Sequence, residues 1–166
     1  MVITLTGFMG CGKSSVGRIL ADRMGCRFAD LDELIVERQG CRIADIFRDR
    51  GEEVFRRIEL ETLREVLRSC EETGQDMVLA LGGGALGLPE ARREVLSGSR
   101  CVFLDTKLET IKKRLGGSDS SRPLFAKADE LYHSRQEIYR QAPYAVKTDS
   151  LTPEEVAMQI ESVLKD

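Results

Sequence analysis

Short apolar runs alternate along this chain with longer stretches in which apolar residues recur every three or four positions. The short runs are rich in β-branched residues and predict buried strands at 2–6, 26–29, 77–81, 101–104 and 145–148. The longer stretches predict helices at about 15–24, 34–39, 43–50, 52–70, 89–96, 108–115, 129–142 and 153–164. Strands that alternate with helices in this way predict a three-layer α/β/α sandwich with a central parallel β-sheet.

Several polar and glycine-rich segments follow directly after predicted strands. They are the loop after residue 6, Asp30 and Asp32, the triplet Gly82-Gly83-Gly84, and Asp105. Ligands bind open parallel sheets at the carboxyl ends of the strands. We therefore expect the functional site at this edge of the sheet.

The loop after the first strand fits the spacing G-x-x-x-x-G-K-[ST] from Gly7 to Ser14. A buried strand precedes it and a helix follows it, which is the context that this phosphate-binding motif requires. Its backbone N–H groups and the helix N-terminus favour phosphate. We expect nucleotide phosphates to be bound by Gly10, Cys11, Gly12, Lys13, Ser14 and Ser15.

Two acidic residues, Asp30 and Asp32, come at the end of the second predicted strand. One carboxylate can hold Mg²⁺ beside the Ser14 hydroxyl, and the other can orient or deprotonate a hydroxyl of the acceptor. The alternative is that both simply cap the following helix, since Asp is common at such positions. The phosphate-binding loop upstream favours the functional interpretation.

Charged side chains stand on apolar helix faces at three positions. Arg56 lies at the edge of the apolar face of helix 52–70, and Glu59 lies near its centre. They are three residues apart and can pair, either as a structural ion pair or to hold the arginine for an anionic ligand. Arg135 shares a helix face with Ile138. A guanidinium group in such a place suits a carboxylate or a phosphate.

Glycines mark two further loops. The triplet at Gly82 to Gly84 lets another molecule approach the backbone closely. Gly116 and Gly117 precede a polar stretch that carries Arg122, and we interpret residues 116–127 as a mobile lid, although a plain surface loop has the same pattern.

Composition and charge restrict the class of protein. The 166 residues suit a single domain spanning 1–166, and the net charge of −3 argues against a nucleic-acid partner. We see neither a membrane-spanning apolar run nor a targeting segment before the first strand. Five widely spaced cysteines indicate reduced thiols that serve as small core residues. Cys11 has an alternative, because cationic groups beside its loop can lower the pKa of its thiol. We expect a cytoplasmic monomer without membrane partners.

Taken together, these segments resemble the shikimate kinase family of P-loop small-molecule kinases over nearly the whole chain. The most specific stretches are Ile43-Ala44-Asp45-Ile46-Phe47, Gly51-Glu52 and Phe55-Arg56-Arg57-Ile58-Glu59. The resemblance also rests on the loop Gly7 to Ser15, Asp30-Leu31-Asp32, Leu81-Gly82-Gly83-Gly84-Ala85 and Arg122-Pro123-Leu124. The resemblance implies a nucleoside-monophosphate-kinase-like fold and transfer of the γ-phosphoryl group of ATP to the 3-hydroxyl of shikimate, in aromatic amino-acid biosynthesis.

The resemblance also implies roles for individual residues. Lys13, Asp32 and Arg122 would be catalytic, with Arg122 on the lid, and Ser14 and Asp30 would hold Mg²⁺. The segment 31–61 would bind shikimate through Asp32 and Arg56, with Ile43, Phe47 and Phe55 against its ring. Gly83, Gly84 and Arg135 would bind it from outside that segment. Arg114 and Pro153 would flank the adenine.

Three other classes of protein compete with this interpretation. A gluconate or nucleoside-monophosphate kinase would share the fold, but a base would call for an aromatic or amide-rich acceptor site. A GTP-binding switch protein would need an N-K-x-D motif, which the sequence lacks. A non-catalytic nucleotide-binding module is disfavoured by the presence of Lys13, Ser14, Asp32 and Arg122.

Overall fold

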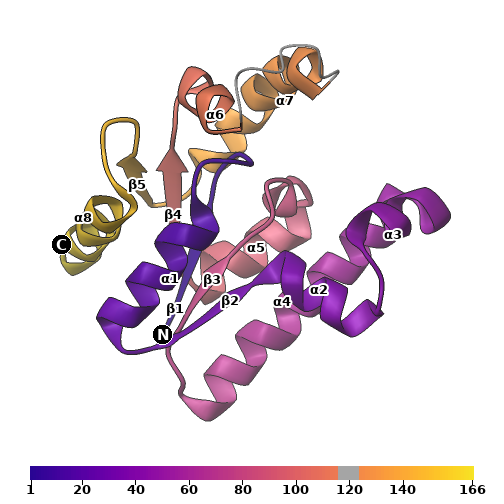
Figure 1. Ribbon diagram of the computed structural model, residues 1–166. Helices are drawn as coiled ribbons and strands as arrows, with labels where there is room; N and C mark the ends of the chain where they lie inside the picture. The colour runs from indigo at the N-terminus through magenta and orange to yellow at the C-terminus, as the bar shows by residue number, and fades with distance from the viewer. Residues whose placement is uncertain (116–123) are drawn as a thin grey trace.

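A computed structural model describes residues 1–115 and 124–166 (Figure 1). Its five strands form one sheet in which all neighbouring strands are parallel, in the order β2-β3-β1-β4-β5. The strands are β1 (Val2–Thr6), β2 (Arg27–Asp30), β3 (Met77–Ala80), β4 (Arg100–Asp105) and β5 (Tyr144–Lys147). This sheet confirms the predicted fold class, and each predicted strand lies within a residue or so of its observed position.

Helices connect the strands in the order expected of parallel crossovers. They are α1 (Lys13–Met24), α2 (Leu31–Gln39), α3 (Ile43–Arg50), α4 (Glu52–Thr73), a 3₁₀ turn η1 (Ala85–Gly87), α5 (Pro89–Gly98), α6 (Leu108–Arg114), α7 (Leu124–Tyr139) and α8 (Pro153–Lys165). The main difference from the prediction is α7, which begins at Leu124 rather than near residue 129. The last four residues of the predicted lid, 124–127, are therefore helical, and the rest of it lies outside the described residues.

Separate hydrophobic clusters cover the two faces of the sheet. On one face, α1 and α8 pack together against the sheet, and the cluster includes Leu5 of β1, Leu20 of α1 and Ile160 of α8. On the other face, α2, α4 and α5 pack against the sheet, and the cluster includes Leu79 of β3 and Leu63 of α4. A third, smaller cluster joins the loop after β1 to β4, α6 and α7, and its buried members are Phe8, Phe103, Ile111 and Tyr139.

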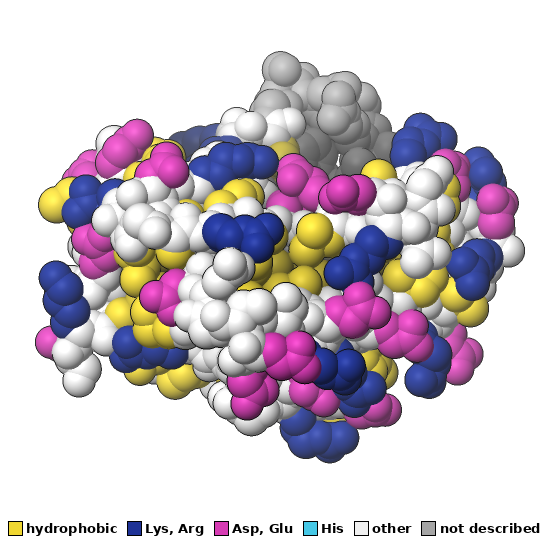
Figure 2. Space-filling model, turned by 90° about the horizontal axis from the view of Figure 1, so that it is seen from below, with side chains coloured by type: hydrophobic (Ala, Val, Ile, Leu, Met, Phe, Trp, Pro, Cys, Tyr) yellow, Lys and Arg dark blue, Asp and Glu magenta, His cyan; other side chains and the backbone are white. Residues whose placement is uncertain are grey.

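The surface bears out an ordinary, mixed charge distribution. On the face seen in Figure 2, basic and acidic side chains of the described residues are interspersed, and neither sign forms a continuous region. Among the helices of the described residues, none combines the length and the apolar character needed to cross a bilayer.

Candidate functional site

The loop between β1 and α1 has the form that phosphate binding requires. Gly12, with φ of 98°, adopts the left-handed conformation immediately before the helix begins at Lys13. The N–H of Cys11 donates to the Phe8 carbonyl at 3.1 Å and closes the loop. The remaining N–H groups at the start of α1 form an anion-binding helix terminus.

Lys13 lies over this loop. Its Nζ donates to the Gly7 carbonyl at 2.5 Å and to the Phe8 carbonyl at 3.2 Å. The ammonium group is thus held at the point where the loop and the helix N-terminus would meet a phosphate. The structure therefore places Lys13 over the loop, and its contact with a nucleotide phosphate remains a prediction.

Asp30 is both a helix cap and a partner of the phosphate-binding loop. Its Oδ1 accepts from the Glu33 N–H at 3.2 Å and caps α2, while its Oδ2 accepts from the Ser14 hydroxyl at 2.6 Å. The two interpretations offered for this residue are therefore compatible. Two oxygen donors from different elements meet here, which is the chemistry that Mg²⁺ prefers.

Asp32 lies in the first turn of α2 and faces the glycine triplet. A β-carbon built on Gly82 would lie 2.8 Å from Asp32 Oδ1 and 3.3 Å from Glu59 Oε2, so the two carboxyl groups share this position. Burial raises the pKa of Asp32, and the nearby Asp30 carboxylate raises it further, against the opposing effect of Lys13 and Arg56. A raised pKa suits a carboxylate that accepts a proton.

The predicted ion pair of α4 is present. Arg56 Nη1 donates to Glu59 Oε1 at 2.8 Å, and only 2% of Glu59 is exposed. Burial raises the pKa of Glu59, although the guanidinium groups of Arg56 and Arg135 both oppose this. A guanidinium has five N–H donors, so this contact leaves Arg56 with others for a ligand.

Arg56 and Arg135 converge on Gly84 from two different helices. A β-carbon built on Gly84 would lie 2.9 Å from Arg135 Nη2 and closer still to Arg56 Nη2. A side chain of any kind would displace both guanidinium groups. The triplet is therefore a place where backbone and two cations approach the same point. The family resemblance implied that these residues bind one ligand, and their convergence on Gly84 is a finding of the structure.

A cavity of about 460 Å³ opens in front of this point. Its lining residues come from α4, the triplet, η1 and α7: Glu52, Arg56, Gly83, Gly84, Gly87, Leu88, Leu131, Ser134, Arg135, Ile138 and Tyr139. The expected ring contacts Ile43, Phe47 and Phe55 are not part of this lining. Phe47 and Phe55 instead pack against each other, with ring centroids 4.7 Å apart and ring planes tilted by 38°, and the Phe55 ring lies 5.1 Å from the Arg56 guanidinium carbon.

The remaining nucleotide-side predictions have mixed outcomes. Arg114 Nη1 donates to the Cys11 carbonyl at 3.2 Å, which places its guanidinium beside the phosphate-binding loop. Pro153 is exposed at the first position of α8, where nothing tests its contact with adenine. Arg122 lies outside the described residues, so its role remains a prediction.

Of the two alternatives for Cys11, the structure supports a small core residue and contradicts a lowered pKa. The thiol is 1% exposed, and burial raises its pKa even though Lys13 Nζ lies 3.9 Å from its Sγ. Desolvation of the thiolate outweighs the attraction of the nearby cations. The side chain therefore behaves as a small apolar residue that packs under the loop.

Tyr139 is a residue of this cavity that the sequence analysis did not identify. It lines the cavity, is 1% exposed, and donates its hydroxyl hydrogen to the Gly83 carbonyl at 2.5 Å. The only signal in the sequence is its spacing, four residues after Arg135 on the same helix face. That spacing cannot reveal which carbonyl the phenol meets.

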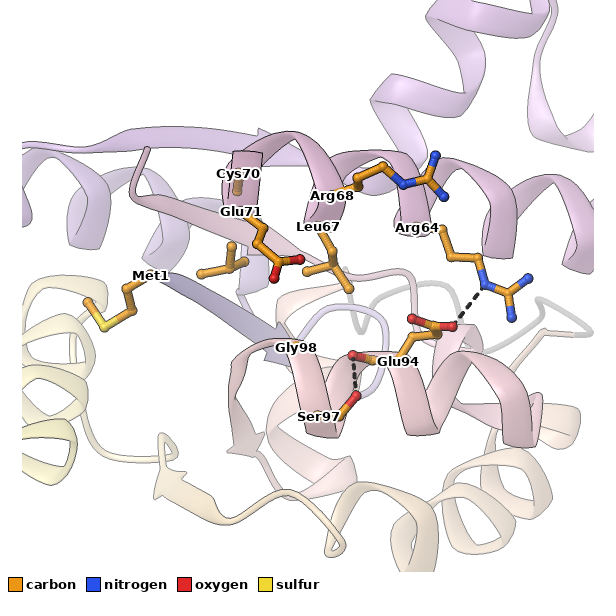
Figure 3. Close-up of a pocket in the computed structure, with 10 residues that line it drawn as sticks. Met1, Arg64, Leu67, Arg68, Cys70, Glu71, Glu94, Ser97 and Gly98 are labelled. Atoms are coloured by element: carbon orange, nitrogen blue, oxygen red, sulfur yellow. Dashed lines mark hydrogen bonds and ion pairs between the residues drawn. The ribbon is translucent and has the colours of Figure 1, made fainter. Parts of the chain in front are cut away.

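A second cavity, of about 630 Å³, lies at the opposite end of the sheet between α4 and α5, where β1 begins (Figure 3). Arg64 reaches across it to α5, where its Nε donates to Glu94 Oε1 at 3.0 Å. This partly exposed ion pair links α4 to α5. None of the residues named for nucleotide or acceptor binding lines this cavity.

Comparisons with known proteins agree with the geometry of the sheet edge. A family model described as shikimate kinase matches residues 9–165. The shikimate kinase of Streptomyces coelicolor is 45% identical over 161 residues, which cover 93% of this chain and 90% of the relative. That of Persephonella marina is 38% identical over 162 residues and 95% of each chain.

Solved structures give the same result. The shikimate kinase of Acinetobacter baumannii in complex with shikimate matches with a TM-score of 0.87 and 32% identity, over 99% of this chain and 92% of that one. The shikimate kinase of Bacteroides thetaiotaomicron matches with a TM-score of 0.89 and 27% identity, over 100% and 99% of the two chains. On a family match over nearly its whole length and relatives at these identities, the chain belongs to the shikimate kinase family.

Proposed function

We propose that this protein transfers the γ-phosphoryl group of ATP to the 3-hydroxyl of shikimate, giving shikimate 3-phosphate and ADP. Family membership supports the reaction. The observation in this chain that carries it is the convergence of Arg56 and Arg135 on Gly84, in a cavity beside the phosphate-binding loop. Two guanidinium groups at one point suit a planar carboxylate on the acceptor, and shikimate carries one.

The nucleotide is bound by the loop and the start of α1. The N–H groups of residues 10–15 would hold its phosphates, and Lys13 would neutralise the charge that develops on the transferred group. Arg114 is placed beside the loop by its bond to the Cys11 carbonyl and would extend the site toward the base. Arg122 would add a second cation from the lid.

Mg²⁺ fits the pair formed by Ser14 and Asp30, whose oxygens lie 2.6 Å apart at the end of the phosphate-binding loop. Both are hard oxygen donors, and Mg²⁺ commonly takes few protein ligands alongside phosphates and water. When bound, the ion would neutralise phosphate charge and align the transferring group.

Asp32 would act on the acceptor. Its carboxyl group lies against Gly82, the first residue of the glycine triplet, and its raised pKa favours taking the proton of a hydroxyl. Glu59 would hold Arg56 in position while leaving its other N–H donors for the carboxylate. We also propose that the enzyme works as a cytoplasmic monomer with a single domain.

A coupled ADP-release assay across candidate acceptors tests the proposal. Shikimate, gluconate and nucleoside monophosphates are compared at equal concentration with ATP and Mg²⁺. We expect turnover with shikimate to exceed turnover with the others by orders of magnitude. Preference for gluconate or for a nucleoside monophosphate would reject the assignment of the acceptor while retaining the kinase fold.

A further inference from the structure

Tyr139 joins the two substrate regions of the site through one hydrogen bond and one aromatic cluster. Its hydroxyl donates to the Gly83 carbonyl at 2.5 Å, and its ring lies 5.3 Å from that of Phe103 on β4. The same buried cluster contains Phe8 from the phosphate-binding loop. The side chain is therefore held from both sides before any ligand is considered.

The hydrogen bond from Tyr139 affects the site through the position of the Gly83 peptide. A β-carbon built on it would lie 3.3 Å from Arg135 Nη1 and 3.7 Å from the Gly7 carbonyl. The peptide thus lies between the guanidinium of α7 and the phosphate-binding loop. With no side chain of its own to anchor it, Gly83 depends on hydrogen bonds to its backbone for its orientation.

The phenol is a permanent donor at this point. Burial raises the pKa of Tyr139 to about 12, so its hydroxyl stays protonated throughout the physiological range. The Gly83 carbonyl is accordingly turned toward α7. Arg135 projects from the same face of α7 one turn earlier, so one helix both orients the triplet and supplies a cation to it.

We propose that Tyr139 is a positioning residue for the acceptor site. Its hydrogen bond holds the Gly83–Gly84 backbone in the position that the guanidinium groups of Arg56 and Arg135 approach. This inference rests on the proposed function, because the ligand concerned is the acceptor carboxylate. It assigns no chemical step to the phenol. The bond fixes the peptide, and the peptide and the two arginines together form the binding surface.

The test compares Tyr139→Phe with Tyr132→Phe. Tyr132 lies on the same helix and also donates its hydroxyl to a backbone carbonyl, that of Thr106, at 2.7 Å. Both substitutions keep the ring and remove a hydroxyl that donates to a backbone carbonyl, so we expect similar, small losses in melting temperature. Only Tyr139→Phe should weaken shikimate binding, by about three- to tenfold as measured by calorimetry, which is the value of one lost hydrogen bond. Affinity for a non-hydrolysable ATP analogue should not change in either variant.

Two outcomes would overturn the inference. Equal shikimate affinity in Tyr139→Phe and the wild type would show that the bond does not position the triplet. Parallel losses of shikimate and nucleotide affinity, or equal losses in both variants, would reveal a general structural role. Failure of the wild type itself to bind shikimate would instead reject the proposed function, so the two failures are distinguishable.

Discussion

The phosphate-binding loop and the acceptor cavity meet at one edge of the sheet, but they are assembled from different kinds of contact. The loop is made of consecutive residues, and its bonds connect positions a few residues apart, such as Lys13 with Gly7. The cavity is made of side chains from α4 and α7 that reach the glycine triplet after β3. The loop depends on local backbone geometry, whereas the cavity depends on how distant helices dock.

This difference separates two properties of the enzyme. The loop binds phosphate mostly through its own backbone N–H groups, so it can bind any nucleotide phosphate and contributes little to selection of the acceptor. The acceptor is selected by charged side chains of the cavity that are half-buried or fully buried. An unpaired charge is costly in such a place, so these side chains favour an acceptor that carries the opposite charge. Substitutions in the loop should therefore abolish the reaction, whereas substitutions in the cavity should change which acceptor is used and how tightly.

Lys13→Ala should have the largest effect. The lysine is the cation closest to the phosphate position, so we expect kcat to fall by about 10³-fold or more while the fold is retained. Turnover is measured by ADP release and folding by circular dichroism, with the exposed Lys165→Ala as a control. Near-normal turnover in the folded Lys13 variant would contradict the nucleotide assignment.

Asp32→Asn should lower kcat by about 10²–10⁴-fold with little effect on nucleotide affinity, because the carboxylate acts on the acceptor hydroxyl. The same change should raise the melting temperature at neutral pH. Burial raises the pKa of Asp32 in the folded state, so stability is lost as pH rises from the ordinary carboxyl pKa through the raised one. The neutral amide escapes this loss. An unchanged kcat with weaker nucleotide binding would place Asp32 on the metal instead.

Arg56→Lys and Arg135→Lys should each raise KM for shikimate by about ten- to a hundredfold, since lysine lacks the planar fork that binds a carboxylate through two bonds. KM for ATP should change little. The exposed neighbours provide matched controls, Arg57→Lys on α4 and Arg140→Lys after α7, and neither should affect KM for shikimate. A rise in KM for ATP in the site variants would assign these arginines to the nucleotide.

Thiol alkylation should have the smallest effect. Cys41 is exposed, whereas Cys11 is buried with a raised pKa, so iodoacetamide should label Cys41 and leave turnover nearly unchanged. The variant Cys41→Ser should lose most of the rapid labelling, as followed by mass spectrometry. Inactivation of that variant in a way that ATP prevents would show that Cys11 is reactive after all.

The same difference in construction explains what the sequence could predict. The loop could be located with its residue roles because a contiguous motif and its flanking elements determine it. Arg56 and Glu59 could be paired because both lie on one helix, three residues apart. Arg135 stood out because a charge on an apolar face needs a partner.

Features that depend on docking between elements could not be predicted. The Tyr139 hydroxyl meets Gly83 because of the position of α7 against the triplet, which no local pattern records. Arg64 pairs with Glu94 because α5 packs against α4, and no spacing along the chain records that packing. For Cys11, the balance between desolvation and nearby cations depends on burial depth, and the depth is a property of the folded loop.

The most direct test of the central claim uses an acceptor that differs from shikimate at one group. In the carboxamide analogue of shikimate, the carboxylate is replaced by a neutral amide of nearly the same shape. Calorimetry should show that the wild type binds this analogue at least about tenfold more weakly than shikimate, because charge-assisted bonds to Arg56 and Arg135 are lost. Arg56→Lys and Arg135→Lys should then lose little further affinity for the analogue. Equal affinity of the wild type for shikimate and its carboxamide would contradict the assignment of these two arginines to the substrate carboxylate.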